Sequence, residues 1–410
     1  MIINNVFLFV NYVGDSMTLP HLNISDPNFS TRSVEIEKAR SHSFCATTPF
    51  GLAILRYKEV GQLLRDRRLR QGSYAWPEKN GLTGSFGDFW KRSVIGQEGG
   101  YHKKLRDILV PSLSQDFIYS LTPEFESIAN SLCENLKKKN SCEFMSEFAK
   151  PFAGQAMCIL LGLNKKEWEI ISQDASDLGL AMGVECKLNE NIFNSAYERL
   201  ADLAQGLIKR VRSGEDETSF VSRLYFQMSK VGGLSDLELS DLIVISIFGG
   251  VDTTRSQLGL GIMTFIKYPD EWVKLRNDKS LASNAFDELI RERPTTTWVT
   301  REANQDFEFS GVNINKGTTL HLLVHSSSRD PIWQDSPTFN ISAKRKKHFG
   351  FGGGSHHCVG HFMAKSDSVI ALLALSSFMK KIQHDNEATL LPDSGNTSPI
   401  TLPIKYAVNY

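Results

Sequence analysis

The pattern of apolar and polar positions divides the chain into a helical majority and a few short extended stretches. Apolar residues recur at intervals of three or four from about residue 100 to 290 and again after residue 358. Alternating or β-branched runs occur near residues 50–56, 298–324 and 396–408, with turn residues between them. No internal repeat, low-complexity tract or long linker interrupts the pattern. It predicts one mainly helical domain with small β-sheets.

The longest helical pattern follows Ser235, which forms a capping-box sequence with Glu238. Apolar residues continue until Pro269, which predicts a helix of about 33 residues, roughly 50 Å long. Its centre reads Phe248-Gly249-Gly250-Val251-Asp252-Thr253-Thr254. A glycine in a helix interior costs about 1 kcal/mol, so we expect a local opening of the backbone hydrogen bonds here. Close helix packing on the glycines is the alternative interpretation.

Composition places the chain among ordinary soluble globular proteins. Of its 410 residues, 41% are hydrophobic and 22% charged. The net charge is zero, so nothing indicates binding to nucleic acid or to an acidic membrane surface. The six cysteines lack the spacing of a disulfide framework, which fits a reducing compartment, and we expect a cytoplasmic protein.

The apolar stretch at the N-terminus does not predict a membrane anchor. Residues 2–13 are interrupted by asparagines and are shorter than the about 20 apolar residues that a spanning helix needs. The stretch also lacks the basic region and cleavage site of a signal peptide. Met17 is an alternative start. We therefore expect residues 1–16 to be a loosely ordered extension and residues 17–410 to form the single domain.

One cysteine lies in a glycine-rich loop before an apolar helical pattern. The loop reads Phe351-Gly352-Gly353-Gly354-Ser355-His356-His357-Cys358-Val359-Gly360. Glycines let the backbone approach a bulky ligand closely, and a helix N-terminus stabilises a thiolate. The loop therefore predicts a sulfur ligand to a metal. A buried structural thiol, a flexible turn and a zinc site with the neighbouring histidines are the alternatives, although no second pair of zinc ligands is obvious.

This loop closely resembles the haem-binding segment of the cytochrome P450 family, F-G-x-G-x-H-x-C-x-G. Its fixed positions are filled by Phe351, Gly352, Gly354, His356, Cys358 and Gly360. The resemblance extends from about residue 20 to 405, with the motifs in the family order. It implies the P450 fold, a triangular-prism domain that holds haem b (iron protoporphyrin IX) between the long central helix and the cysteine-loop helix. Cys358 would be the metal ligand, and Phe351, His356 and Gly360 would contact the cofactor.

The same resemblance assigns roles to the central helix. Gly249 and Gly250 would make room for dioxygen beside the haem. Asp252 and Thr253 would be the acid–alcohol pair that delivers protons during oxygen activation, while the thiolate donates electron density from the other side. We do not expect Thr254 to be catalytic.

The resemblance also predicts cationic anchors and a structural ion pair. The residues expected to bind the haem propionates are His102, Arg106, Arg301 and His348. Glu288 and Arg291 resemble the family's E-x-x-R element, with Arg345 as its third member, and would hold the scaffold rather than react. Two positions depart from the common pattern: Ser328 replaces an asparagine and Lys365 an arginine. Neither is expected to touch the cofactor.

The family's substrate-lining segments are rich in apolar and aromatic residues here. The residues expected to contact substrate are Trp76, Phe89, Leu180, Ile245, Phe248, Trp298, Val299 and Ile400. They predict an apolar, mid-sized and possibly aromatic or polycyclic ligand, such as an intermediate of secondary metabolism. Trp298, three residues before Arg301, is expected to shorten the cavity over the haem.

We therefore expect a haem-thiolate monooxygenase, working as a monomer, that activates O₂ with electrons from a ferredoxin and its reductase. The basic run Lys344–Lys347, just before the cysteine loop, would help an acidic donor to dock. One alternative is an H₂O₂-driven peroxygenase or decarboxylase, for which Arg255 could bind a substrate carboxylate, or an oxidative coupling enzyme. Another is a haem-binding sensor or carrier without turnover, in which the acid–alcohol pair would have no purpose.

Overall fold

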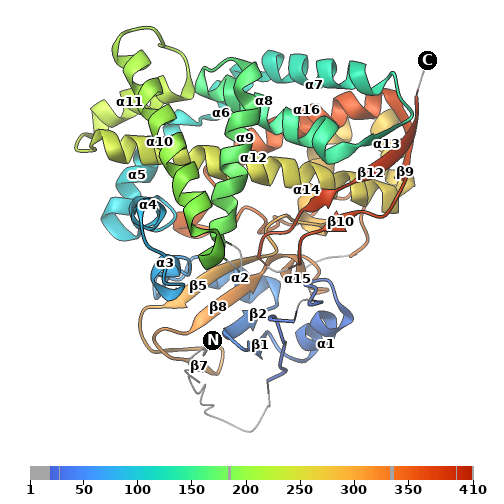
Figure 1. Ribbon diagram of the computed structural model, residues 1–410. Helices are drawn as coiled ribbons and strands as arrows, with labels where there is room; N and C mark the ends of the chain where they lie inside the picture. Colours follow the sequence, from blue (N-terminus) through green and yellow to red (C-terminus); the bar gives the residue numbers. More distant parts are fainter. Residues whose placement is uncertain (1–18, 27, 183–185, 333–336, 394, 409–410) are drawn as a thin grey trace.

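The computed structural model describes residues 19–26, 28–182, 186–332, 337–393 and 395–408. The N-terminal extension expected over residues 1–16 lies outside this part of the chain. Figure 1 shows a large helical region above a smaller region built around a sheet.

The helices are α1 (Val34–His42), α2 (Tyr57–Leu63), α3 (Trp76–Lys79), α4 (Ser85–Arg92), α5 (Gly99–Ser112), α6 (Gln115–Ser120), α7 (Thr122–Leu136), α8 (Lys150–Leu161), α9 (Trp168–Gly179), α10 (Glu190–Arg212), α11 (Phe220–Val231), α12 (Asp236–Lys267), α13 (Pro269–Asn277), α14 (Ala282–Glu292), α15 (Val324–Ser327) and α16 (His361–Phe378). The strands are β1 (Cys45–Thr48), β2 (Gly51–Ile54), β3 (Leu69–Gln71), β4 (Ser141–Glu143), β5 (Trp298–Ala303), β6 (Phe307–Phe309), β7 (Val312–Ile314), β8 (Thr319–Leu323), β9 (Met379–His384), β10 (Thr389–Leu390), β11 (Pro399–Thr401) and β12 (Pro403–Val408).

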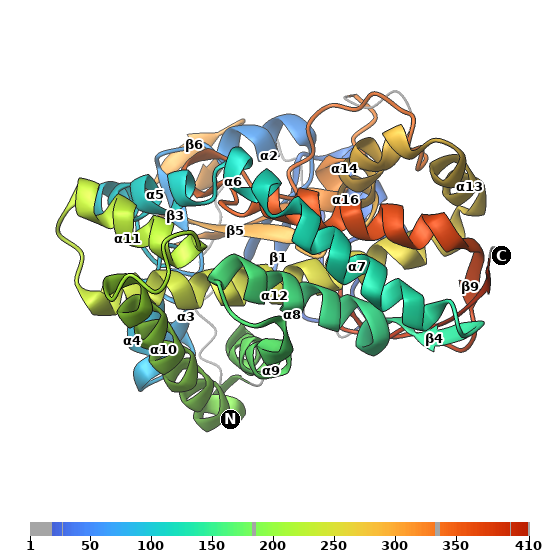
Figure 2. The ribbon, with the colours of Figure 1, turned by 90° about the horizontal axis from the view of Figure 1, so that it is seen from above.

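Helix α12 runs through the middle of the helical region (Figures 1 and 2). Its start is fixed by the predicted capping box, in which Ser235 accepts from the Glu238 N–H at 3.3 Å and Glu238 accepts from the Ser235 N–H at 2.7 Å. It ends at Lys267, and Pro269 begins α13. Both predicted ends are confirmed.

The expected opening in the middle of α12 is wrong, because the helix continues through Gly249 and Gly250 without a break. Gly250 instead allows α8 to approach, since a Cβ at this position would lie 2.4 Å from Met157 Cε. A Cβ at Gly249 would meet no atom within 4 Å. Close packing against α8 therefore explains the glycine at Gly250, whereas open space lies beside Gly249.

The main sheet has five strands in the order β1-β2-β8-β5-β3. Strand β8 runs parallel to β2 and antiparallel to β5, and β3 adds to the edge with Gln71 opposite Arg301. The extended stretches predicted near residues 50–56, 298–324 and 396–408 all contain strands, whereas β1, β3, β4, β9 and β10 lie outside the predicted ranges. The register of β3 and β5 matters because it brings Gln71 and Arg301 to the site described below.

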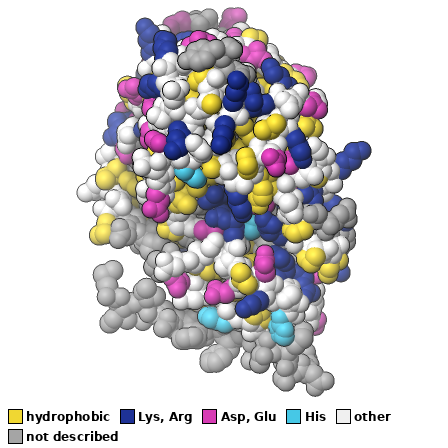
Figure 3. Space-filling model, turned by 90° about the vertical axis from the view of Figure 1, so that its right-hand side faces the viewer, with side chains coloured by type: hydrophobic (Ala, Val, Ile, Leu, Met, Phe, Trp, Pro, Cys, Tyr) yellow, Lys and Arg dark blue, Asp and Glu magenta, His cyan; other side chains and the backbone are white. Residues whose placement is uncertain are grey.

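The surface carries charges of both signs. Figure 3 shows the face on the right-hand side of Figure 1, where acidic and basic side chains are interspersed and several Lys and Arg side chains gather near the middle. Among the described residues, no helix has both the length and the apolar character needed to cross a bilayer.

Candidate active site

The cysteine loop folds back on itself immediately before α16. Gly354–His356 form a short 3₁₀ turn, and the Cys358 N–H donates to the Phe351 carbonyl at 2.9 Å. Gly352 and Gly354 have φ angles of 66° and 69°, which side chains disfavour. A Cβ at Gly354 would also lie 2.4 Å from the Leu64 carbonyl oxygen. Glycine is therefore required at this turn, which presents Cys358 at the start of α16.

The surroundings of Cys358 act on its thiol in opposite directions. Burial raises the pKa of this thiol, whereas the Gly360 N–H and the Arg106 guanidinium lower it. Burial has the larger effect, so the pKa of Cys358 lies above its ordinary value. Arg106 is held beside the loop by a 2.9 Å hydrogen bond to the His357 carbonyl. In the described residues no three His, Cys, Asp or Glu side chains are arranged to hold a metal ion, so the zinc alternative gains no support.

Basic side chains from three separate segments meet beside the loop. The His102 ring stacks on His356 with 4.1 Å between centroids. His102 is 3% exposed, and its Nε2 has no hydrogen-bond partner in the part of the chain that the structure describes. Burial, with the charge of His356 as the next cause, lowers the pKa of His102 to about 4. Arg301 is equally buried and donates to Gln71 Oε1 at 2.5 Å. Burial lowers the Arg301 pKa to about 10.

One carboxylate, that of Glu98, lies in this cluster, and the sequence reasoning missed it. Its Oε1 lies 3.0 Å from His356 Nε2 and accepts from the Gln71 N–H at 2.6 Å. Burial raises the pKa of Glu98, but the hydrogen bonds and charge of His356 outweigh it and bring the pKa below its ordinary value. Glu98 lies four residues before His102 and far from the loop in the sequence, and no sequence pattern indicated that it would join the cluster.

These groups fit haem. Each propionate is a carboxylate, and a surplus of basic side chains, with His102 Nε2 unpartnered among the described residues, suits a ligand that carries anionic groups. Cys358 offers the soft sulfur that iron takes in thiolate-ligated haem proteins. A Cβ at Gly249 or at Gly360 would project into open space, as a flat ligand between α12 and the loop requires.

The proposed acid–alcohol pair is on α12, in half-exposed positions. The Thr253 hydroxyl donates to the Gly249 carbonyl at 2.6 Å, so its oxygen lone pairs are left to accept a hydrogen bond. Asp252 forms an ion pair with Arg255 at 2.5 Å. The sequence pattern indicated both residues but not the ion pair between Asp252 and Arg255.

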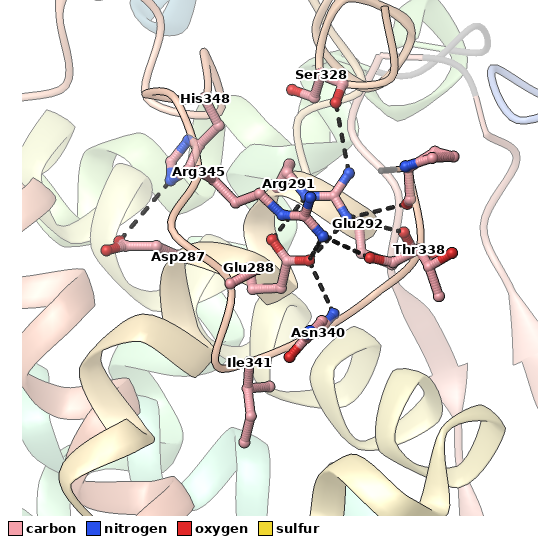
Figure 4. A network of polar contacts seen from close by, with 12 residues as sticks. Asp287, Glu288, Arg291, Glu292, Ser328, Thr338, Asn340, Ile341, Arg345 and His348 are labelled. Atoms are coloured by element: carbon pink, nitrogen blue, oxygen red, sulfur yellow. Dashed lines mark hydrogen bonds and ion pairs between the residues drawn. The ribbon is translucent and has the colours of Figure 1, made fainter. Parts of the chain in front are cut away.

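The E-x-x-R residues form a buried network with Arg345 (Figure 4). Arg291 donates to both carboxylate oxygens of Glu288, at 2.7 and 2.8 Å, and Arg345 reaches Glu288 at 3.2 Å. His348 lies beside this network, with Nε2 3.9 Å from Asp287 Oδ1, and in the described structure it makes no hydrogen bond, ion pair or ring contact with the histidine–arginine cluster. Lys365 also pairs with Asp287, at 2.7 Å. The structure therefore places His348 apart from the other expected anchors.

Two of the expected substrate contacts are corrected by the structure. On β5, side chains alternate between faces, so Trp298 points away from the face that carries Val299 and Arg301. The Trp298 ring packs on Phe29 and His321, at 6.3 and 5.3 Å, instead of shortening a cavity over the haem. Phe89 is 0% exposed in the core, stacked on Tyr197 at 4.9 Å.

The remaining expected contacts differ in exposure. Trp76 is half-buried and donates to the Ala181 carbonyl at 2.8 Å, which joins α3 to the segment after α9. Leu180 is 37% exposed and Ile400 52% exposed, whereas Ile245 is buried. Phe248 and Val299 are half-buried.

Comparison with known proteins agrees with this geometry. The Cytochrome P450 family model matches residues 186–406. Luteothin monooxygenase of Streptomyces thioluteus is 31% identical over 395 residues, which are 95% of this chain and 96% of that protein. The polyketide biosynthesis cytochrome P450 PksS of Bacillus subtilis is 26% identical over 361 residues, 85% of each chain.

The solved structure of CYP109Q5 from Chondromyces apiculatus superposes with a TM-score of 0.84 at 20% identity, covering 96% of this chain and 100% of that one. This likeness shows the mainly helical fold with small sheets that the sequence predicted. The monooxygenase relatives leave no reason to retain the sensor or carrier alternative. Motif, fold and relatives agree, and the chain belongs to the cytochrome P450 family as a P450 monooxygenase.

Proposed function

We propose that this monooxygenase uses haem held by Cys358, takes electrons from a separate ferredoxin and ferredoxin reductase, and inserts oxygen from O₂ into a mid-sized apolar substrate. The observation that carries the proposal is the cationic cluster around the cysteine loop. Its basic side chains suit a ligand that carries carboxylates, and Cys358 suits a ligand atom that binds sulfur. Bound haem supplies the oxidation chemistry, and the protein residues orient it and handle the protons.

We assign the propionates to His102, Arg106, Arg301 and His356. All four lie in the cluster with Glu98, and buried guanidinium groups are well suited to bind carboxylates. His348 was expected in this set, but its position beside Asp287 favours a role in holding the segment before the cysteine loop.

We assign the delivery of protons to Thr253 and Asp252. The Thr253 hydroxyl gives its hydrogen to the Gly249 carbonyl, so it can accept a hydrogen bond from a water or reacting group on the open side of α12. Asp252 can collect protons from solvent because its side chain is 32% exposed. Its ion pair with Arg255 must open before the carboxylate can pass a proton toward Thr253.

We propose that the electron donor docks near the cysteine loop through acidic groups. Lys344, Lys346 and Lys347 are exposed, while Arg345 turns inward to Glu288. Lys347 lies near the loop, because its charge contributes, after burial, to lowering the pKa of His357 to about 4. A positive surface here would attract an acidic ferredoxin.

We propose an apolar substrate from secondary metabolism, since relatives include a luteothin monooxygenase and a polyketide P450. Trp76, Leu180, Ile245, Phe248, Val299 and Ile400 remain candidate contacts. All six cysteines are free, which supports a cytoplasmic location.

The peroxygenase or decarboxylase alternative needs an arginine that is available to a substrate carboxylate. Arg255 is the nearest candidate on α12, but Asp252 occupies its guanidinium at 2.5 Å. This pair favours the O₂-dependent reaction.

An isotope experiment separates the two reactions. Compounds are first screened for a substrate-induced spin-state shift of the holoenzyme, beginning with luteothin. The compound that gives a shift is then incubated with ferredoxin, reductase and ¹⁸O₂, or with H₂¹⁸O₂ alone. We expect the label in product from ¹⁸O₂ with the donor system. Efficient labelling from H₂¹⁸O₂ alone would contradict the proposal.

A further inference from the structure

The carboxylate of Glu98 is the only acidic group that the described structure places in hydrogen-bond contact with the cationic cluster. It occupies the N-cap position of α5 without a side-chain capping bond, and its side chain is 32% exposed. One oxygen, Oε1, serves both His356 Nε2 at 3.0 Å and the Gln71 N–H at 2.6 Å. Glu98 therefore connects the helix that carries His102 and Arg106 to the cysteine loop and to strand β3.

Gln71 extends this connection to Arg301. It lies opposite Arg301 in the β3–β5 pairing, and its side-chain oxygen accepts from Arg301 Nη1 at 2.5 Å. The Gln71 backbone N–H is thereby directed to Glu98, while its side chain is directed to Arg301. A continuous chain of hydrogen bonds runs from Arg301 through Gln71 and Glu98 to His356.

The direction of these bonds determines what each cation has left to offer. A carboxylate only accepts, so the His356 nitrogen that faces Glu98 carries a hydrogen, and Nδ1 is the ring nitrogen that remains for another partner. Among the described residues, the hydrogen bonds of the buried Arg301 side chain come from one terminal nitrogen, Nη1, which donates to Gln71 and to the Thr300 carbonyl. Glu98 thus holds its neighbours in place while leaving donors unused.

We propose that Glu98 is a positioning residue that holds His356 directly, and Arg301 through Gln71, in the arrangement that receives the haem propionates. The inference rests on the proposed assignment of these cations to the propionates. In the absence of Glu98, four groups that can carry positive charge would lie together without an acidic partner, and the His356 ring would lose the bond that fixes its orientation.

The test compares haem retention in Glu98→Gln and wild type. Both holoproteins are mixed with an excess of a haem-scavenging apo-globin, and the release rate is followed by absorbance. We expect release to be faster by about tenfold in Glu98→Gln, the size of one charge-assisted hydrogen bond. Glu98→Asp, which keeps the charge, should recover part of the loss. The haem reduction potential should rise in Glu98→Gln, because a negative charge near the haem is removed.

Glu143→Gln is the matched control. Glu143 is also half-buried and accepts from backbone N–H groups, of Ser146 and Leu402 at 2.6 Å each, but it lies on β4 away from the cluster. We expect its haem release and reduction potential to equal those of the wild type. If Glu98→Gln does not fold, Gln71→Met provides the test, because it keeps the N–H to Glu98 and removes only the acceptor for Arg301.

The outcomes separate the inference from the proposed function. A wild-type protein whose reduced CO complex lacks the thiolate-type Soret band would refute the proposed function, whatever Glu98 does. A normal wild-type spectrum with release from Glu98→Gln and Gln71→Met unchanged within about twofold would overturn the inference alone. Equal acceleration in Glu143→Gln would also overturn it, because the effect would then not depend on the cluster.

Discussion

At the scale of single residues, the neighbours of Thr253 on α12 determine how its hydroxyl is oriented. Its hydroxyl is anchored on the Gly249 carbonyl, and the glycine leaves open space at the same turn of the helix. Alanine removes the hydroxyl, whereas serine keeps it. This position therefore offers a pair of variants that differ by one functional group.

We expect Thr253→Ala to bind haem and substrate normally and to yield at least about tenfold less product per electron, with the difference appearing as H₂O₂, because general acid–base groups contribute about 10²–10⁴-fold. The ratio of product to electron donor consumed measures this coupling. Thr253→Ser should remain close to the wild type. Unchanged coupling in Thr253→Ala would exclude the hydroxyl from proton delivery.

A second residue-scale prediction concerns Asp367 on α16. This side chain is 1% exposed, and its contacts are the Thr254 hydroxyl at 3.5 Å and the Ser368 hydroxyl at 3.3 Å. Burial raises its pKa from the ordinary value of 3.8 to about 8. The folded state therefore binds a proton that the unfolded state releases above pH 3.8.

Because the folded pKa is raised, the stability that Asp367 contributes is complete below about pH 4 and falls by about 1.4 kcal/mol for each pH unit up to about pH 8. Asp367→Asn keeps a side chain of the same size that cannot ionise. We expect the thermal midpoint of the variant, relative to the wild type, to rise as the pH increases from 4 to 8. A difference independent of pH would show that Asp367 ionises normally.

The sequence predicted the residues of the site that belong to a contiguous motif, and it missed those that meet only in three dimensions. Cys358, Gly354 and His356 belong to one motif of ten adjacent residues, which can be recognised in the sequence. Glu98 and Gln71 come from segments far from the loop, and no local pattern indicates that a carboxylate and an amide will meet His356 and Arg301.

At the scale of secondary-structure elements, α14 is attached to the segment before the cysteine loop through Glu288, which pairs with Arg291 in the same helix and with Arg345 of that segment at 3.2 Å. Glu288 and Arg291 are each 1% exposed, and Glu288 also accepts from the Asn340 N–H at 3.0 Å. Removal of one partner leaves an uncompensated charge in the interior. The importance of the pair to the scaffold is therefore the loss of folding stability that follows when one partner is removed.

We expect Glu288→Gln to destabilise the protein by about 3–5 kcal/mol, because Arg291 loses the carboxylate that accepts two of its hydrogen bonds and keeps only the longer 3.7 Å contact with Glu292. Glu134→Gln provides the control, since Glu134 and Lys137 have the same i,i+3 spacing but are 63% and 40% exposed, and an exposed pair contributes only about 0.5 kcal/mol. Chemical denaturation of both variants measures the difference. Equal effects would show that burial of the Glu288–Arg291 pair has no consequence.

The boundaries of elements were predicted best where capping and proline fix them, as at both ends of α12. The composition of an element was a poorer guide to its interior. Two glycines predicted an opening of α12, but tertiary packing keeps the helix continuous. Trp298 was placed by its distance from Arg301 along the chain, although an odd spacing puts two strand residues on opposite faces.

At the scale of the whole molecule, a net charge of zero conceals a local positive surface beside the cysteine loop. Lys344, Lys346 and Lys347 are exposed there. An attraction between this surface and an acidic donor would weaken with salt, since charges are screened over about 8 Å at physiological ionic strength.

We expect Lys347→Glu to slow the reduction of the haem by ferredoxin by about tenfold at low salt, and the difference to shrink as salt is added. Stopped-flow reduction of the holoenzyme measures the rate. Lys138→Glu is the control, because Lys138 is exposed and lies in another basic run, at the end of α7. The haem of this variant should be reduced at the wild-type rate. Equal effects of the two substitutions would contradict docking beside the cysteine loop.

The fold could be predicted from the order of motifs along the chain, because each motif occupies a fixed place in the family architecture. The substrate could not be predicted in the same way. The candidate contacts come from separate segments of the chain. An aromatic residue in such a segment can pack in the core instead of lining a pocket, as Phe89 and Trp298 do.

The central claim is that Cys358 binds haem iron as a thiolate, and the absorbance spectrum of the reduced CO complex tests it most directly. The wild-type protein should show the Soret band typical of thiolate-ligated haem, and Cys358→Ala should lose that band. A wild-type spectrum typical of histidine-ligated haem, or a thiolate band that survives in Cys358→Ala, would contradict the account.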